Sequence, residues 1–232
     1  VLCEKPFAMN FEEASQMIEQ SKKNSTALLD GMWMRYLPHI TKLRELLSKN
    51  AIGKVESIFA RHCQNLRWSD NPRLWTKELG GGALLDLGIY VVSFCHMVTG
   101  SPDEIIASSI FTKENVDSKT SMVFKYDNGL IANLSCSMYD SQPNRAIISG
   151  SDGYIEIDHT FYAPTTIKLY KNDKEIIEYK NDYKGHGLRQ QAIYMEKCVL
   201  DNKLESDKMT HKDTLEVMKI MDEVRRKTGL KF

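Results

Sequence analysis

Apolar residues recur every three or four positions in two segments near the start of the chain, residues 10–22 and 38–47. This spacing is typical of amphipathic helices. Asn10, followed by two acidic residues, has the character of a helix N-terminus. The mostly apolar run 26–34 between them has the length of a strand, and the opening residues VLCEKP form a shorter one. We therefore expect a strand–helix–strand unit, followed by a second helix.

The pattern changes after residue 53 to short runs that are rich in β-branched and aromatic residues, with turn signals such as Asp127-Asn128-Gly129 between them. The predicted strands are 55–62, 104–112, 120–125, 130–138, 145–149, 154–158, 166–171 and 174–179. Helices are predicted at 83–99, 187–202 and 212–228, the last followed by Gly229 as a cap. This order of elements favours an antiparallel or mixed sheet with helices packed against it.

Composition places the chain among globular proteins, because its 232 residues are 42% hydrophobic and 27% charged. Lys plus Arg and Asp plus Glu both number 31, so no net field attracts nucleic acid or an anionic membrane, and neither partner is predicted. The five cysteines are widely spaced and form no C-x-x-C pair, which indicates reduced thiols and a cytoplasmic protein. The chain begins with Val and without a signal-peptide pattern, so we expect its start to lie inside a longer polypeptide.

Glu4-Lys5-Pro6 lies at the end of the first predicted strand. Ligands of α/β sheets bind at the carboxyl ends of the strands. A surface lysine beside a loop proline explains these three residues equally simply and, on them alone, is the favoured interpretation. The functional alternative is that the proline, in a cis peptide bond or otherwise, stiffens the loop and aims the ammonium into a cleft.

Three consecutive glycines at 80–82 precede a helical segment that carries Asp86 and Tyr90. Four residues apart on a helix, a carboxylate and a phenol share one face, as a site would require. A glycine-rich loop followed by an ordinary core helix is an equally good interpretation of this stretch alone. The glycines do not form G-x-G-x-x-G, so a nucleotide cradle is not predicted here.

Other residue types give weaker signals. Arg35 follows the second predicted strand, where it could hold a substrate or serve only as a capping or salt-bridged arginine. The six histidines show no H-x-x-x-H spacing, so no metal is predicted. The sequence also lacks G-x-S-x-G, the simplest hydrolase signature.

Taken in order, the motifs are E-K-P, W-x-R-x-x-P, G-G-G-A-L-x-D-x-G-x-Y, S-G-x-x-G, G-L-R-x-Q and M-D-E-V-R-R. In this order they resemble the Gfo/Idh/MocA family of NAD(P)-dependent oxidoreductases, which includes glucose-fructose oxidoreductase and inositol dehydrogenase. Within it, the chain is most similar to the branch that includes dimeric dihydrodiol dehydrogenase. The resemblance runs from Val1 to nearly Phe232.

The resemblance implies an α/β (α+β) fold. A large open, mostly antiparallel sheet covered by helices on one face would form a substrate-binding and dimerisation domain over residues 35–232. Residues 1–34 would be the C-terminal remnant of a Rossmann domain whose first strands, with their G-x-G-x-x-G loop, are missing from this sequence. We therefore expect this chain alone to be inactive, and its remnant to be loosely packed or rearranged.

The resemblance also implies roles for single residues. Lys5, Asp86 and Tyr90 match the catalytic positions, and Glu4, Lys5 and Pro6 match positions that contact NAD or NADP. Arg35 and Asp86 match substrate-binding positions.

A mechanistic hypothesis follows from these roles. An unperturbed tyrosine has a pKa near 10, so a neighbouring cation must favour its phenolate if it is to act as a base at neutral pH. We hypothesise that Tyr90 is the general base and that Lys5 lowers its pKa. Asp86 would hold Lys5 or a substrate hydroxyl.

Two functions remain open from the sequence. The first is hydride transfer between nicotinamide and a secondary alcohol of a sugar, polyol or trans-dihydrodiol. The second is a non-catalytic binding or dimerisation module on the same scaffold. A scaffold has no need to retain Lys5, Asp86 and Tyr90 together, which favours the enzyme. In either case the open sheet face predicts a homodimer, because an uncovered apolar face requires burial.

Overall fold

The computed structural model describes residues 1–231, and an eight-stranded sheet is its largest element. Its strands are β3 (Val55–Cys63), β4 (Glu104–Phe111), β5 (Asp117–Lys125), β6 (Ile131–Ser137), β7 (Ala146–Gly150), β8 (Gly153–Ile157), β9 (Ile167–Lys171) and β10 (Lys174–Tyr179). Their order is β10-β9-β8-β7-β3-β6-β5-β4. Only β3 and β6 pair in parallel, so the predicted mostly antiparallel sheet is confirmed.

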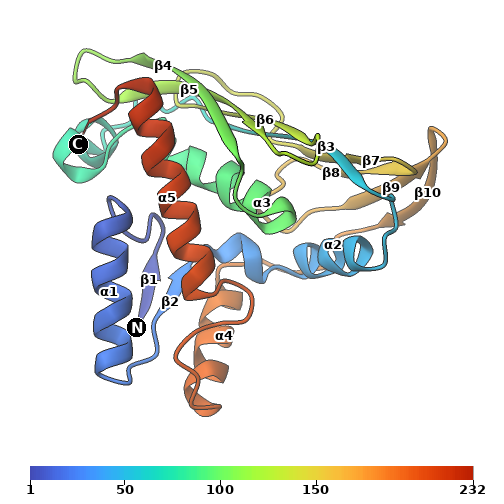
Figure 1. Cartoon of the computed structure of the whole chain (residues 1–232), viewed down its shortest axis with the longest axis horizontal. Helices are drawn as coiled ribbons and strands as arrows, with labels where there is room; N and C mark the ends of the chain where they lie inside the picture. Colours follow the sequence, from blue (N-terminus) through green and yellow to red (C-terminus); the bar gives the residue numbers. More distant parts are fainter. Residues whose placement is uncertain (232) are drawn as a thin grey trace.

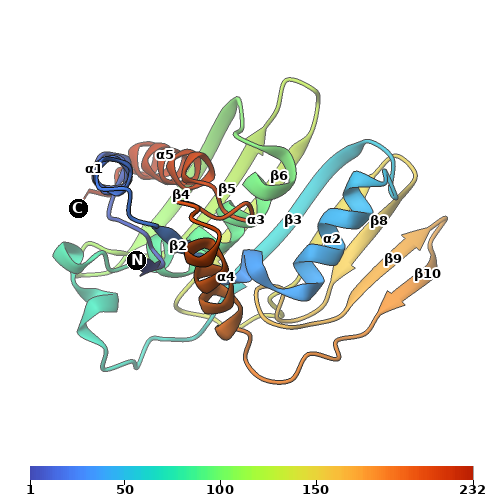
Figure 2. The same cartoon turned by 90° about the horizontal axis from the view of Figure 1, so that it is seen from below.

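Helices cover one face of this sheet and leave the other open (Figure 1). They are α2 (Pro38–Ser48), α3 (Ile89–Thr99) and α5 (His211–Thr228), and all three lie in front of the strands when the molecule is seen from below (Figure 2). The strands supply the matching pattern: in β6, Ala132 and Leu134 are buried beneath the helices, whereas Ile131 and Asn133 are exposed. Side chains alternate between the two faces of a strand, so a single buried face produces this alternation.

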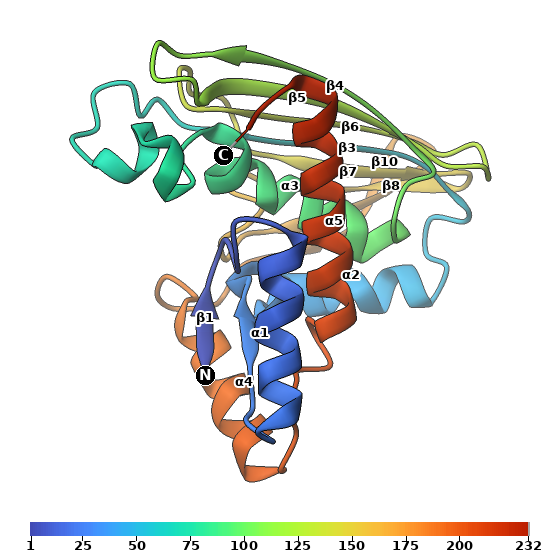
Figure 3. The same ribbon diagram turned by 60° about the vertical axis from the view of Figure 1, so that its left-hand side comes forward.

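A smaller unit lies beside the helical face (Figure 3). Strands β1 (Leu2–Glu4) and β2 (Leu29–Gly31) pair in parallel. They are flanked by α1 (Phe11–Lys23) and α4 (Arg189–Leu200). The expected loose packing is not found, because Phe7, Ala14 and Ile18 are buried in the main hydrophobic core. The predicted domain boundary at residue 34 stays a prediction.

The second predicted strand, 26–34, is shorter than expected. It ends at Gly31 and is followed by a 3-10 turn, Trp33–Tyr36. The Asp30 carboxylate accepts a hydrogen bond from the Met32 N–H at 3.0 Å, and the Arg35 N–H donates to the Met32 carbonyl at 2.9 Å. Local hydrogen bonds of an Asx type compete with sheet pairing and turn the chain here.

The predicted helix 83–99 also differs in detail, because it begins with a π-helical turn, Leu84–Gly88, before α3. Single π turns in helices occur often at functional sites. At Gly88 a Cβ atom would lie 3.0 Å from the Cys136 Sγ, so a glycine lets this turn approach β6 closely. The segment Lys77–Thr99 is apolar and long enough to cross a membrane, but 89% of its most apolar window is buried inside the protein, as in a core helix. The remaining predicted elements differ from the structure only at their ends.

Candidate active site

Lys5 and Tyr90 meet on the helical side of the sheet. Lys5 follows β1, and Tyr90 lies in the first turn of α3. The Lys5 ammonium lies 4.8 Å from the centre of the Tyr90 ring. The Lys5–Pro6 peptide bond is cis. The convergence of these two side chains, which lie far apart in the sequence, is what the catalytic assignment requires.

Asp86 holds Lys5 in this position. The Lys5 Nζ donates to the Asp86 carbonyl oxygen at 2.8 Å and to its Oδ1 at 3.2 Å. The Arg73 guanidinium binds the same carboxylate oxygen. Burial would raise the pKa of Asp86, but Lys5 and Arg73 outweigh it and hold that pKa below its usual value. Burial lowers the pKa of Lys5, and Asp86 opposes this. The site therefore contains two cations on one carboxylate.

Arg73 is a site residue that the sequence did not indicate. It comes from the 3-10 turn Pro72–Trp75, and the glycine run folds back against this turn. At Gly81 a Cβ atom would lie 2.8 Å from the carbonyl oxygens of Arg73 and Leu74, so only glycine allows the contact. No regular spacing relates Arg73 to Asp86, because an irregular loop joins them.

The Tyr90 hydroxyl accepts a hydrogen bond from the Trp33 indole N–H at 2.7 Å. Burial raises the pKa of Tyr90 above its usual value, and the Trp33 hydrogen bond only partly opposes this. The pKa of Tyr90 is therefore shifted upward, whereas the hypothesis expected Lys5 to lower it. The physical reason is that Tyr90 is 5% exposed and the ammonium lies against the ring face. Tyr90 is consequently a neutral phenol at neutral pH.

Aromatic side chains surround the Tyr90 ring. His62, at the end of β3, lies edge-on to the Tyr90 ring, with ring centres 5.0 Å apart. The same imidazole stacks on Tyr162, with ring centres 3.9 Å apart. His186 lies against Trp33, with ring centres 5.1 Å apart. Burial, and then Lys5, lower the pKa of His62 to about 3, so this imidazole is neutral. His62 and Tyr162 had no signal in the sequence, whereas Trp33 stands in the W-x-R-x-x-P motif.

Polar groups continue the site beyond Tyr162. The Gln64 amide donates to the Tyr162 hydroxyl at 2.9 Å. Both residues line an open cavity of about 780 Å³, together with Asn144, Arg145 and His159. Its walls are rich in amide, hydroxyl and imidazole groups, which suit a ligand with several hydroxyls.

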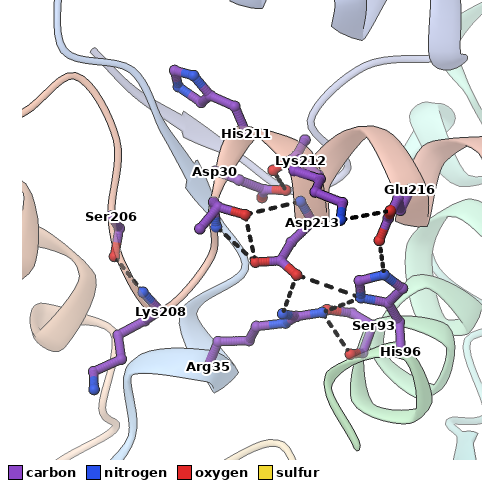
Figure 4. Close-up of polar contacts among 12 residues, drawn as sticks. Asp30, Arg35, Ser93, His96, Ser206, Lys208, His211, Lys212, Asp213 and Glu216 are labelled. Carbon is purple, nitrogen blue, oxygen red and sulfur yellow. Dashed lines mark hydrogen bonds and ion pairs between the residues drawn. The ribbon is translucent and has the colours of Figure 1, made fainter. Parts of the chain in front are cut away.

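The structure does not bring Arg35 together with Lys5 and Tyr90, and it does not line the cavity, so its predicted role in substrate binding stays a prediction. Its side chain is 1% exposed, and the Nε donates to the Ser93 Oγ at 3.0 Å (Figure 4). One terminal nitrogen donates to the Ser93 carbonyl at 2.9 Å, and the other lies 3.7 Å from the Asp213 carboxylate. The alternative of a salt-bridged internal arginine is the one that the structure supports.

Glu4, Lys5 and Pro6 lie at the carboxyl end of β1, where β2 runs beside it in parallel. Glu4 is exposed and accepts a hydrogen bond from the Gln191 amide at 2.7 Å. Within residues 1–231, no group of three or more His, Cys, Asp or Glu side chains has the geometry to hold a metal ion.

The sequence is similar to those of known oxidoreductases. The profile of the GFO/IDH/MocA C-terminal domain matches residues 40–156. Trans-1,2-dihydrobenzene-1,2-diol dehydrogenase of Danio rerio is 34% identical over 239 residues, which span 100% of this chain and 71% of the relative. The scyllo-inositol 2-dehydrogenase (NADP(+)) of Bacillus subtilis is 31% identical, with coverage of 100% and 71%.

Solved structures share this fold. The aldose-aldose oxidoreductase from Caulobacter crescentus, complexed with glycerol, superimposes with a TM-score of 0.85 at 21% identity, over 99% of this chain and 70% of that one. A 3-ketoreductase from Actinomadura kijaniata, in complex with NADP and TDP-benzene, gives a TM-score of 0.85 at 20% identity, over 98% and 70%.

Proposed function

We propose, since this chain belongs to the Gfo/Idh/MocA family of oxidoreductases, that it binds the substrate in an NAD(P)-dependent dehydrogenase. The substrate would be a secondary alcohol of a sugar, polyol or trans-dihydrodiol, or the corresponding ketone. The observation that carries this proposal is the meeting of Lys5, Asp86 and Tyr90, which puts a cation and a proton-transfer group beside one another.

The residues after β1 fit the nicotinamide end of the cofactor. Glu4 offers an exposed carboxylate acceptor and Lys5 an ammonium donor at the carboxyl end of parallel strands, which matches the donor and acceptor of a carboxamide. When bound, NAD(P) supplies the hydride acceptor for oxidation and the hydride donor for reduction. The sequence contains no G-x-G-x-x-G segment, so the proposal assigns only the nicotinamide end to these residues.

Tyr90 transfers the proton in this proposal. The Trp33 N–H occupies one acceptor position of the Tyr90 oxygen. The hydroxyl hydrogen of Tyr90 has no acceptor within the described part of the chain, so it is available to a substrate oxygen. In reduction the phenol gives this proton to the nascent alkoxide, and in oxidation the phenolate takes it from the alcohol. Trp33 then stabilises the phenolate by its hydrogen bond.

The walls of the site suit a polyhydroxylated ring. Tyr162 lines the cavity and lies beside Tyr90, and the C–H face of a sugar or the ring of a diol can pack against its ring. Gln64 and Asn144 add amide groups at the side of the cavity. Binding sites of this kind combine apolar walls with a few polar groups that fix orientation.

The open sheet face supports a homodimer as part of the same proposal. Phe59, Ile106 and Ile131 are exposed there by 36%, 49% and 43%. They come from β3, β4 and β6, with β5 lying between β6 and β4, and a second copy of the chain would bury them.

The proposal is tested in the full-length protein with a panel of sugars, polyols and trans-diols and with NAD+ and NADP+. Formation of reduced nicotinamide with one of them is the expected result. In Tyr90→Phe we expect turnover to fall by about 100-fold or more with the cofactor affinity retained, because proton transfer is lost and the ring is kept.

Tyr126→Phe is the matched control, because Tyr126 is a buried tyrosine whose hydroxyl binds Thr99 and Gly100 rather than the site. Its turnover should stay close to that of the parent protein. Near-normal turnover of Tyr90→Phe, or no activity on the panel in a protein that binds NAD(P), would contradict the proposed function.

A further inference from the structure

We propose that Arg35 is a positioning residue that fixes the hydrogen bond between Trp33 and Tyr90. This inference rests on the proposed function for the role of Tyr90. It arises from the place of Arg35 in the fold: it is buried outside the substrate cavity, yet it joins the turn that carries Trp33 to the helix that carries Tyr90.

Two parallel cross-links connect these elements. Trp33 and Arg35 lie two residues apart in one 3-10 turn. Tyr90 and Ser93 lie three residues apart on α3, which places them on one face of the helix. The Trp33 indole reaches the Tyr90 hydroxyl at 2.7 Å, and the Arg35 Nε reaches the Ser93 Oγ at 3.0 Å. The contact between Arg35 and Ser93 therefore holds the turn and α3 at the separation that the Trp33–Tyr90 hydrogen bond requires.

The guanidinium is directed at Ser93 rather than at its nearest carboxylate. Two of its nitrogens bond to Ser93, one to the Oγ and one to the main-chain carbonyl at 2.9 Å. The Asp213 carboxylate is farther away, at 3.7 Å. An arginine that served only to neutralise Asp213 would not need a two-point contact with α3. The rigid fork of arginine holds two acceptors in a fixed geometry, which lysine cannot do.

A third element stabilises the arrangement (Figure 4). The same Arg35 nitrogen that binds the Ser93 carbonyl lies 3.2 Å from the His96 Nδ1, and the His96 Nε2 lies 2.7 Å from Glu216 on α5. This network connects α3 and α5 to the 3-10 turn that carries Trp33 and Arg35. None of the residues in this network lines the cavity, so the network can orient the phenol without occupying the substrate site.

The geometry also explains why a small displacement would matter. The turn is short and internally bonded, with the Arg35 N–H donating to the Met32 carbonyl at 2.9 Å, so Trp33 and Arg35 move together. A shift of about 1 Å would break a hydrogen bond of this length, and misplacement on that scale can cost about 100-fold in rate.

The experiment measures the Trp33–Tyr90 hydrogen bond directly. In protein labelled with ¹⁵N-tryptophan, the chain gives three indole N–H signals, and Trp33→Phe identifies the one from Trp33. We expect Arg35→Lys to increase its hydrogen-exchange rate by about 10-fold or more, because the fork to Ser93 is lost while the positive charge is kept. Ser93→Ala, which removes only the Oγ, should have a smaller effect in the same direction.

Glu216→Gln is the matched control. It alters the same network at its far end, but a Gln oxygen still accepts from His96, so exchange of the Trp33 indole should not change. In the full-length enzyme, Arg35→Lys should lower kcat by about 10-fold with little change in KM, and should move the alkaline pH dependence of kcat upward. A purely structural role would instead lower stability without these kinetic changes.

The outcomes separate this inference from the proposed function. If Tyr90→Phe is inactive but Arg35→Lys and Ser93→Ala leave the indole exchange and kcat unchanged, the inference about Arg35 is wrong and the function stands. If Arg35→Lys increases exchange while Tyr90→Phe keeps its turnover, Arg35 positions Trp33 as inferred and the role of Tyr90 is wrong. Equal acceleration in Arg35→Lys and Glu216→Gln would indicate general loosening and overturn the inference.

Discussion

At the scale of single residues, burial is the main influence on the pKa of Tyr90, the proposed proton-transfer group. Tyr90 is 5% exposed, and the loss of solvation raises the pKa of its phenol although Trp33 donates a hydrogen bond to it. Desolvation always favours the neutral form of an acid. The ammonium of Lys5 is close in distance but lies over the ring face, away from the oxygen on which the negative charge would develop.

This raised pKa predicts a pH dependence. At neutral pH Tyr90 is protonated, which suits proton donation in reduction, whereas oxidation requires the scarce phenolate. In the full-length protein, kcat/KM for oxidation should rise from about pH 6 to about pH 10 without a plateau near neutrality, while reduction should not rise over that range. Steady-state kinetics in both directions would check this. An oxidation profile that levels off below pH 7 would contradict it.

Some residues of the candidate site are visible in the sequence, and others are not, for a physical reason. Lys5, Asp86 and Tyr90 stand in short motifs whose residue types carry chemistry, and the structure brings all three together. Arg73 and His62 were missed because their partners are set by a folded loop and by the end of a strand. Neither arrangement leaves a periodic signal in the chain.

At the scale of secondary-structure elements, the glycine-rich turn before the π turn packs closely against Asp117 at the start of β5. Gly82 has a φ of +109°, and a Cβ atom there would lie 2.3 Å from the Asp117 Oδ1. The other oxygen of this carboxylate accepts the Leu84 N–H at 2.9 Å. Only glycine satisfies both the backbone conformation and the close contact, and the start of the helix depends on it.

Gly82→Ala should therefore lower the free energy of unfolding by about 1–3 kcal/mol or more, because strain and a steric clash act together. Gly129→Ala is the control: its φ is +91°, but no atom lies within 4 Å of the added Cβ, so it reports backbone strain alone, about 1 kcal/mol. Urea denaturation of both variants measures the difference. If both variants lost the same free energy of unfolding, the close contact with Asp117 would contribute nothing to the effect of Gly82→Ala.

At the scale of the whole molecule, the helices and the smaller α/β unit all lie on one side of the sheet (Figure 1). The other side keeps exposed apolar residues on adjacent strands, and a groove of about 430 Å³ runs between them, lined by Phe59, Ile106 and Val123 among others. Single apolar residues are normal on a surface, whereas several of them around one groove of an open sheet face are typical of an interface.

Phe59→Glu should convert the proposed homodimer into a monomer, because it replaces an exposed apolar ring of the proposed contact with a charged group that a second copy would have to desolvate. Light scattering coupled to size-exclusion chromatography gives the mass. Leu200→Glu, at a residue that is 75% exposed on α4, is the control and should leave the mass unchanged. A parent protein that is monomeric at high concentration would contradict the dimer.

The sequence by itself determined the elements and the class of fold, because hydrophobic periodicity and turn residues act over a few neighbouring positions. Through the order of its motifs it also resembled a family in which Lys5, Asp86 and Tyr90 match catalytic positions. Only the tertiary structure decided the role of Arg35 and the direction of the Tyr90 pKa shift. Both depend on which groups surround a side chain after folding, and burial and long-range partners are properties of packing that no local pattern contains.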